Sequence, residues 1–285
     1  MSQIIDSLKN CHRNNILEGE KCDIELSIPE RWELIREVLN NKKNKILLFM
    51  HIPKTGGTTF GERLAEDGVA CVLSADADDK TFLEHLFYLI HADQSRPVVV
   101  RAHHSLRTFL GSGIDLSNSN KVTLISAYRR PIDVHISNVN MIVERLRLFY
   151  KDPKSLPNNV RDFCELWVSR LGVTDVPTGY EVISSSAYID NAAGLFSNFF
   201  NLDSWRELIL SRVLKVINYT DFDQIFTEAY GYSKPPSRKN VMSINYLSKD
   251  DVDVDTKMRL TSKDEPYSKF IEANLSEAKD ICSFV

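Results

Sequence analysis

Short apolar runs alternate along the chain with longer segments whose apolar positions recur every three or four residues. Because the short runs do not alternate apolar with polar residues, they are typical of parallel strands covered on both faces. We expect strands at 45–51, 69–74, 96–102, 121–128 and 212–219. Their succession with helical patterns predicts an α/β fold, a parallel sheet flanked by helices with a mainly helical C-terminal half.

The helical patterns have recognisable starts and apolar faces. Ser27 and Glu30 have the spacing of a capping box, which places the start of the first helix. Its expected buried face consists of Ile28, Trp32, Ile35 and Leu39. Helices are expected over 27–45, 57–67, 80–92, 131–150, 160–172, 185–200, 204–210 and 222–232, followed by two more near the C-terminus.

No repeat, low-complexity tract or Pro/Gly/Ser-rich linker divides the sequence. We therefore expect a single domain over 1–285. Within it, 1–44 is a helical extension, 45–150 the ligand-binding core, and 151–285 mainly helical acceptor-side and closing segments.

Composition narrows the class of partner. The 285 residues are 43% hydrophobic and 26% charged, with a formal net charge of −4, which argues against binding nucleic acid. The five cysteines are scattered and suggest a reduced, cytoplasmic chain. No apolar stretch suits a signal peptide or a membrane span, so we expect a soluble protein. The sequence does not indicate an oligomeric state.

The segment HIPKTGGTTF, residues 51–60, follows the first strand and precedes a helical pattern. Gly56 and Gly57 let backbone N–H groups approach an anion, and the helix start adds further amides. Thr58 and Thr59 supply hydroxyls, and Lys54 supplies a charge. The segment predicts a phosphate site, although a Gly-rich turn with an exposed Lys is the simpler alternative. A Lys after the last Gly, as NTPases have, is missing, which disfavours an ATPase.

A second anion site is expected where the fourth strand runs into a helix. Arg129 lies at the strand tip, Pro131 fits the first helical position, and Ser137 follows about two turns later. Alone, these residues could equally be a surface Arg and a buried Ser.

The two motifs together resemble those of sulfotransferases that use 3′-phosphoadenosine-5′-phosphosulfate (PAPS), especially the branch of the heparan and chondroitin enzymes and their bacterial relatives. The resemblance implies a P-loop-NTPase-like fold and sulfuryl transfer, without a metal, that releases adenosine-3′,5′-bisphosphate. It implies that the 5′ end of the nucleotide is bound by Lys54, Thr55, Gly56, Gly57, Thr58 and Thr59. The 3′-phosphate is assigned to Arg129 and Ser137, with Arg238 and Lys239 closing over it or forming a solvated loop.

The sequence departs from this family at Arg130, where relatives have an acid, and at Val134, where they have an Arg. These departures bear on the acceptor rather than on the family. Since the chain is mildly acidic, we expect a small acceptor alcohol or amine, such as a natural product, a lipid or a saxitoxin-like alkaloid.

A histidine is the expected general base. His103 and His104 follow the third strand, and the Gly-His of relatives matches Ala102-His103, which makes His103 the first choice and His104 the reserve. Lys54 also has a catalytic role, stabilising the leaving phosphate. His51 is interpreted as a hydrogen-bonded structural residue, and His135 as either a nucleotide contact or a packed side chain. The alternatives to a sulfotransferase are a small-molecule kinase and a non-catalytic nucleotide-binding protein.

Overall fold

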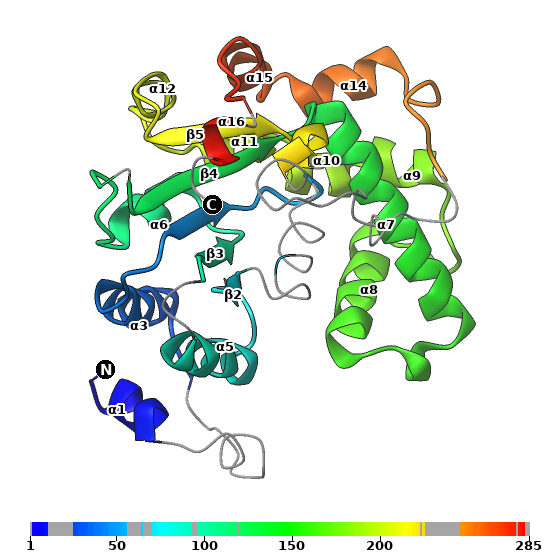
Figure 1. Ribbon diagram of the computed structural model, residues 1–285. Helices are drawn as coiled ribbons and strands as arrows, with labels where there is room; N and C mark the ends of the chain where they lie inside the picture. The colour runs from blue at the N-terminus through cyan, green and yellow to red at the C-terminus, as the bar shows by residue number, and fades with distance from the viewer. Residues whose placement is uncertain are drawn as a thin grey trace. The chain divides into compact units, whose positions relative to one another are not determined.

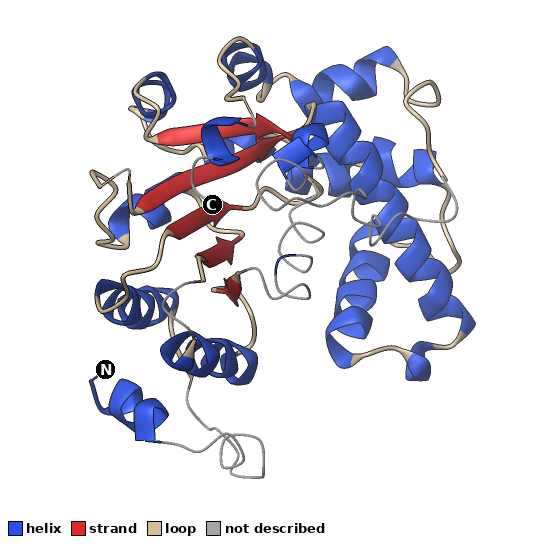
Figure 2. Ribbon diagram, viewed as in Figure 1, coloured by secondary structure: helices blue, strands red, loops and turns tan. Residues whose placement is uncertain are grey.

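A five-stranded, all-parallel sheet forms the core of one part of the chain (Figure 2). This computed structural model describes residues 2–10, 25–55, 64, 70–92, 96–118, 120–222, 224–225, 246–277 and 279–282. The strand order is β2-β3-β1-β4-β5. The strands are β1 (Ile46–Met50), β2 (Cys71–Ser74), β3 (Val98–Ala102), β4 (Val122–Tyr128) and β5 (Leu214–Asn218). The expected α/β class and strands are confirmed.

The chain forms two compact units. The sheet unit comprises 1–128, 199–239 and 274–285, and the helical unit comprises 129–198 and 240–273. The sheet unit therefore recruits β5 from late in the sequence. The single domain expected from the sequence stays a prediction, and each unit is described by itself.

The sheet unit contains α1 (Ser2–Asn10), α3 (Ile28–Asn40), α5 (Asp79–His91), α6 (Leu106–Gly111), α12 (Trp205–Leu210), η2 (Tyr219–Asp221) and α16 (Lys279–Cys282). Helices α3 and α5 lie against each other near β2 (Figure 1). The Ser27 backbone N–H donates to Glu30 over 2.8 Å, which confirms the expected capping box. Ile28 was expected inside but is 50% exposed, because it occupies the first turn, ahead of the buried face. That face includes Leu34 and Val38, which the sequence analysis omitted.

Strand alternation divides the side chains between the two sheet faces. Leu47, Phe49, Val99, Ile125 and Ile217 belong to one buried cluster, which also holds Leu64. The register pairs Phe49 with Arg101 and Arg101 with Ser74, so these side chains share the face of that cluster. Every residue of β1 and β4 is buried, which explains why their sequences are mostly apolar. The two hydroxyl residues inside β4, Thr123 and Ser126, are buried as well.

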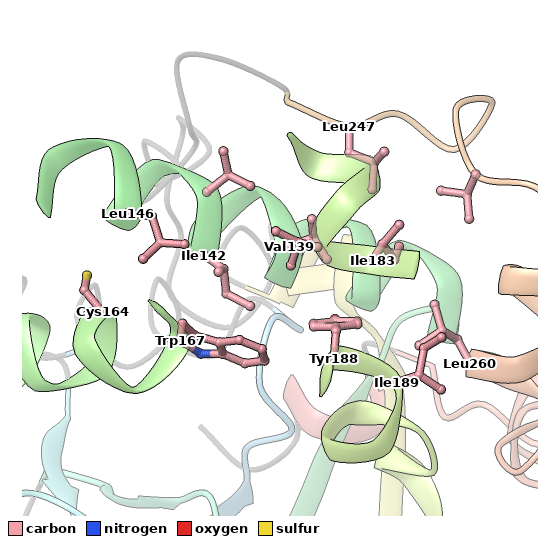
Figure 3. Close-up of a cluster of buried hydrophobic side chains, with 13 residues drawn as sticks. Val139, Ile142, Leu146, Cys164, Trp167, Ile183, Tyr188, Ile189, Leu247 and Leu260 are labelled. Carbon is pink, nitrogen blue, oxygen red and sulfur yellow. The ribbon is translucent and has the colours of Figure 1, made fainter. Parts of the chain in front are cut away.

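The helical unit contains α7 (Pro131–Lys151), η1 (Pro153–Ser155), α8 (Asn158–Leu171), α9 (Gly179–Ser184), α10 (Ser186–Ala192), α11 (Leu195–Phe199), α14 (Val254–Thr261) and α15 (Glu265–Glu272). Its core packs side chains of α7, α8 and α10 together, with the Trp167 and Tyr188 rings 5.9 Å apart (Figure 3). The helix expected over 185–200 is divided at Gly194, whose φ of 83° ends a helical turn.

Three expectations fall on residues that lie outside the described part of the chain. They are most of the helix over 57–67, most of the helix over 222–232, and the stretch around Arg238 and Lys239.

Candidate active site

Strand β1 occupies the position at which the direction of the sheet's winding reverses. The chain passes from β1 outward to β2, returns to β3 beside β1, and then crosses to β4 on the other side of β1. In open parallel sheets, ligands bind outside the carboxyl ends of the strands at such a reversal. The residues that follow β1, β2 and β3 are therefore the first candidates for a site.

The register brings three polar residues to one level at this edge. Met50 pairs with Ala102, so His51 and His103 both follow the last pair of β1 and β3. Ser74 pairs with Arg101, so Asp76 reaches the level of His103. The His51 and His103 rings are 4.4 Å apart between centroids, and Asp76 contacts His103 directly.

The carboxylate of Asp76 orients the ring of His103. Its Oδ2 atom contacts Nδ1 of His103 and accepts the His103 backbone N–H over 3.3 Å. Its Oδ1 atom accepts the Ser74 hydroxyl over 2.9 Å. Because an ionised carboxylate only accepts hydrogen bonds, Nδ1 is the protonated nitrogen, which leaves the lone pair on Nε2. The His103 side chain is 40% exposed. This is the arrangement by which an Asp prepares a His as a general base.

Asp76 remains ionised at neutral pH. Burial raises the pKa of Asp76, but the hydrogen bond and charge of His103 and the hydroxyl of Ser74 outweigh burial, so the pKa is lowered below its ordinary value of 3.8. The carboxylate can therefore stabilise a positive charge that forms on the imidazole.

His104 has a different environment, because adjacent residues at a strand end point to opposite faces. Nε1 of Trp32, on α3, donates to Nδ1 of His104 over 3.0 Å. Neutral His104 therefore carries its proton on Nε2 and has no free lone pair for a base. Burial also lowers the pKa of His104. The geometry favours His103 over His104 as the base.

His51 is a buried, neutral side chain beneath His103. Burial lowers its pKa well below 6.5, and the charges of His103, Arg101 and Lys54 lower it further, against a smaller opposite effect of Asp76. Among the described residues, its Nδ1 has no hydrogen-bond partner, although its backbone N–H donates to Ala102 over 2.9 Å. The burial of His51 supports the structural interpretation, but the hydrogen bond that was expected for its ring is not made by Nδ1 within the described part of the chain. Arg101 and Lys54 thus bring positive charge to this edge, alongside the carboxylate of Asp76.

The segment 51–60, which we call the Lys loop, begins with a tight turn. Both the backbone N–H and the hydroxyl of Thr55 donate to the Ile52 carbonyl, over 3.3 and 2.7 Å. The hydroxyl of this buried residue is thereby used within the turn. Lys54 has a φ of 66°, a left-handed conformation that side chains with a Cβ rarely adopt. Gly56, Gly57, Thr58 and Thr59 lie outside the described residues.

The second predicted anion site belongs to the helical unit. Arg129 lies two residues before that unit's long helix α7, and Ser137 lies within α7; both are half-buried. His135 is buried and its Nδ1 lies 3.2 Å from the Tyr188 hydroxyl, so it is a packed side chain. Burial lowers the pKa of His135 to about 4. Arg238 and Lys239 lie outside the described residues.

Asp76 was missed in the sequence because three acids follow the second strand. Asp78 caps α5 by accepting the Thr81 N–H over 3.0 Å, and Asp79 pairs with Arg31 on α3. Only the pairing of β2 with β3 distinguishes Asp76 as the partner of His103. The usable signal was an acid just past a strand end, next to a strand that ends in a histidine.

Within the described ranges, no group of three His, Cys, Asp or Glu side chains suits a metal ion. No helix in that part of the chain is long and apolar enough to cross a membrane. Comparisons with protein-family models, with curated proteins and with solved structures find no match.

Proposed function

We propose that this protein is a PAPS-dependent sulfotransferase that acts on a hydroxyl or an amine of a small acceptor. The observation that carries the proposal is the Asp76–His103 pair at the carboxyl edge of the sheet, beside the strand that leads into the Lys loop. The sequence motifs resemble those of the PAPS-dependent family, and the strand order with β1 at the centre supports a P-loop-NTPase-like fold.

The chemistry assigns a separate task to each side chain. Nε2 of His103 takes the proton of the acceptor as its oxygen or nitrogen bonds to sulfur. Asp76 stabilises the imidazolium that results. Lys54 places a positive charge where the leaving 5′-phosphate gains negative charge as its bond to sulfur breaks. PAPS, when bound, supplies the sulfuryl group.

The residues present fit an anionic donor. Burial and the positive charges of Arg101 and Lys54, at the same edge, lower the pKa of His51. A site with this potential attracts phosphate and sulfate, even though the whole chain has a net charge of −4. The expected contacts of the 3′-phosphate are Arg129 and Ser137.

The first test is a calorimetric titration with adenosine-3′,5′-bisphosphate, with AMP and ATP as controls. We expect binding that depends on the 3′-phosphate. A preference for ATP would favour a kinase, and no binding of any of the three would remove the proposal.

The second test measures sulfuryl transfer from PAPS to a panel of small alcohols and amines, with and without EDTA. We expect turnover that survives EDTA and that falls by about 10²–10⁴ in His103→Ala, with nucleotide affinity retained. His104→Ala serves as the matched control. Loss of turnover in His104→Ala but not in His103→Ala would refute the choice of base, and unchanged turnover in both variants would refute a histidine base. Nucleotide binding without turnover in the wild type would favour a non-catalytic nucleotide-binding protein.

A further inference from the structure

The side chain of Arg31, on α3, binds the backbone on both sides of Asp76. Its Nη1 donates to the carbonyl of Ala75 over 2.9 Å and also to the carbonyl of Ala77. Its Nη2 donates to Oδ1 of Asp79 over 2.7 Å. The side chain is 12% exposed, and its guanidinium lies 5.1 Å from the centre of the Phe82 ring.

A guanidinium suits this task because it is a rigid, planar fork with several donors. Two carbonyls held by one nitrogen cannot rotate independently, so the backbone of the residue between them is fixed. The direction of the Asp76 side chain follows from that backbone. The other bonds of this loop include Ala75 N–H to the Arg101 carbonyl at 2.9 Å and Ala77 N–H to the Ser74 carbonyl at a long 3.4 Å.

The helix that carries Arg31 is itself firmly held. Trp32, Leu34 and Ile35 are buried, with at most 3% exposure. Trp32, the next residue, donates to His104 on the other face of the sheet. One turn of α3 therefore contacts the segments that follow both β2 and β3.

We propose that α3 is a positioning element for the base, in which Arg31 holds the Asp76 carboxylate against Nδ1 of His103. Arg31 touches neither His103 nor a substrate in this role; it acts through Asp76. This inference rests on the proposed function, because Arg31 can affect catalysis through Asp76 only if His103 is the base. Its structural content, the protonation of Nδ1, can be measured without any substrate.

The substrate-free experiment records the ring nitrogens of His103 by long-range ¹H–¹⁵N NMR on the full chain at alkaline pH, where imidazole is neutral. Wild type is expected to show His103 protonated on Nδ1. Arg31→Gln is expected to lose this preference, so that the Nε2-protonated form becomes the major one. Asp76→Ala should give the same change, which assigns the signal to the pair.

Asp79→Asn is the matched control. It removes the charge of the ion pair but keeps an oxygen that can accept from Arg31, and the two carbonyl bonds stay in place. It should lose some stability and keep Nδ1 protonation. Trp32→Phe, from the same turn, should change the tautomer of His104 and leave that of His103 unchanged. Arg31→Lys can satisfy one carbonyl at a time and should be intermediate.

The kinetic experiment measures sulfuryl transfer by the same variants. Arg31→Gln should lower kcat by about tenfold or more with less than about a twofold change in the KM for PAPS, since only the base is misplaced. Asp79→Asn should stay within about twofold of wild type in both.

The inference is overturned if Arg31→Gln keeps both Nδ1 protonation and the wild-type kcat. It is also overturned if Asp79→Asn shows the same losses as Arg31→Gln in both measurements, since general destabilisation would then explain the effect. Should Arg31→Gln fail to fold, Arg31→Lys decides: an unchanged tautomer and kcat overturn the inference. If Arg31→Gln changes the tautomer of His103 but the wild type transfers no sulfuryl group, the positioning role of Arg31 is supported and only the proposed function is refuted.

Discussion

The left-handed backbone conformation of Lys54 is strained, and this strain predicts a measurable difference in stability between two variants of the residue. Among the described residues, Lys54 and Arg212 are the non-glycine residues with positive φ, at 66° and 61°. A Cβ in this conformation costs about 1–2 kcal/mol. Residues held in such conformations concentrate at ligand-binding sites, where the rest of the structure enforces them.

Two variants of Lys54 separate its charge from its strain. Lys54→Ala removes the ammonium and keeps the Cβ, whereas Lys54→Gly removes both. Glycine relieves the strain, which raises the free energy of unfolding by about 1–2 kcal/mol. The greater freedom of glycine in the unfolded chain lowers it by about 0.5–1 kcal/mol. Lys54→Gly should therefore be more stable than Lys54→Ala by about 1 kcal/mol, or about 2 °C in Tm.

Both variants should bind adenosine-3′,5′-bisphosphate equally poorly. A lost charged hydrogen bond costs about 1.5–3 kcal/mol, which weakens affinity by about 10–100-fold. Urea unfolding measures the stability difference, and calorimetric titration measures the affinities. Arg212→Ala and Arg212→Gly form the matched pair: the hydrogen bond from Arg212 to Ser276, 3.1 Å long, is lost in both, so its contribution cancels. This pair should reproduce the stability difference without a change in nucleotide affinity.

Equal stabilities of Lys54→Ala and Lys54→Gly would refute the strain argument. Wild-type affinity in both variants would instead remove Lys54 from the nucleotide site. A loss of affinity in the Arg212 pair as large as in the Lys54 pair would show that the effect is not local to the Lys loop.

Three further predictions concern Asp76, Arg129 and Tyr188. The folded-state pKa of Asp76 lies below 3.8, so in acid the unfolded chain binds more protons than the folded chain. The stabilisation by this group is therefore present above about pH 5 and is lost as the pH falls. The unfolding free energies of wild type and Asp76→Asn should therefore converge between about pH 5 and pH 2; a constant difference would contradict this. Arg129→Ala should weaken 3′-phosphorylated nucleotide by about 2–3 kcal/mol, and an equal loss for AMP in titration would show that the residue is misassigned. Tyr188→Phe removes a buried hydroxyl that lies 3.2 Å from His135 and 3.3 Å from Asn138, and should cost about 1–3 kcal/mol in urea unfolding; a loss below about 0.5 kcal/mol would mean that these partners find other bonds.

Most of the secondary structure could be predicted because its causes are local. Mostly apolar runs identified every strand from β1 to β5, since a strand buried on both faces leaves few polar positions. The pair Ser27 and Glu30 located the start of α3, since capping is a short-range interaction. The break at Gly194 was missed because a helical pattern does not reveal which glycine adopts a positive φ.

The sequence by itself determined the strands, the approximate helices, the Lys-containing segment after β1 and the candidacy of two adjacent histidines. The family resemblance ranked His103 ahead of His104, but the residues alone gave no physical reason for the choice, because that reason depends on which neighbours meet each face of the sheet. Asp76 joins His103 through the pairing of β2 with β3, and Trp32 joins His104 across 72 positions of sequence. Such contacts depend on strand order and register, which local patterns do not encode. Only the tertiary structure therefore showed that Asp76 orients His103 and that Trp32 occupies Nδ1 of His104.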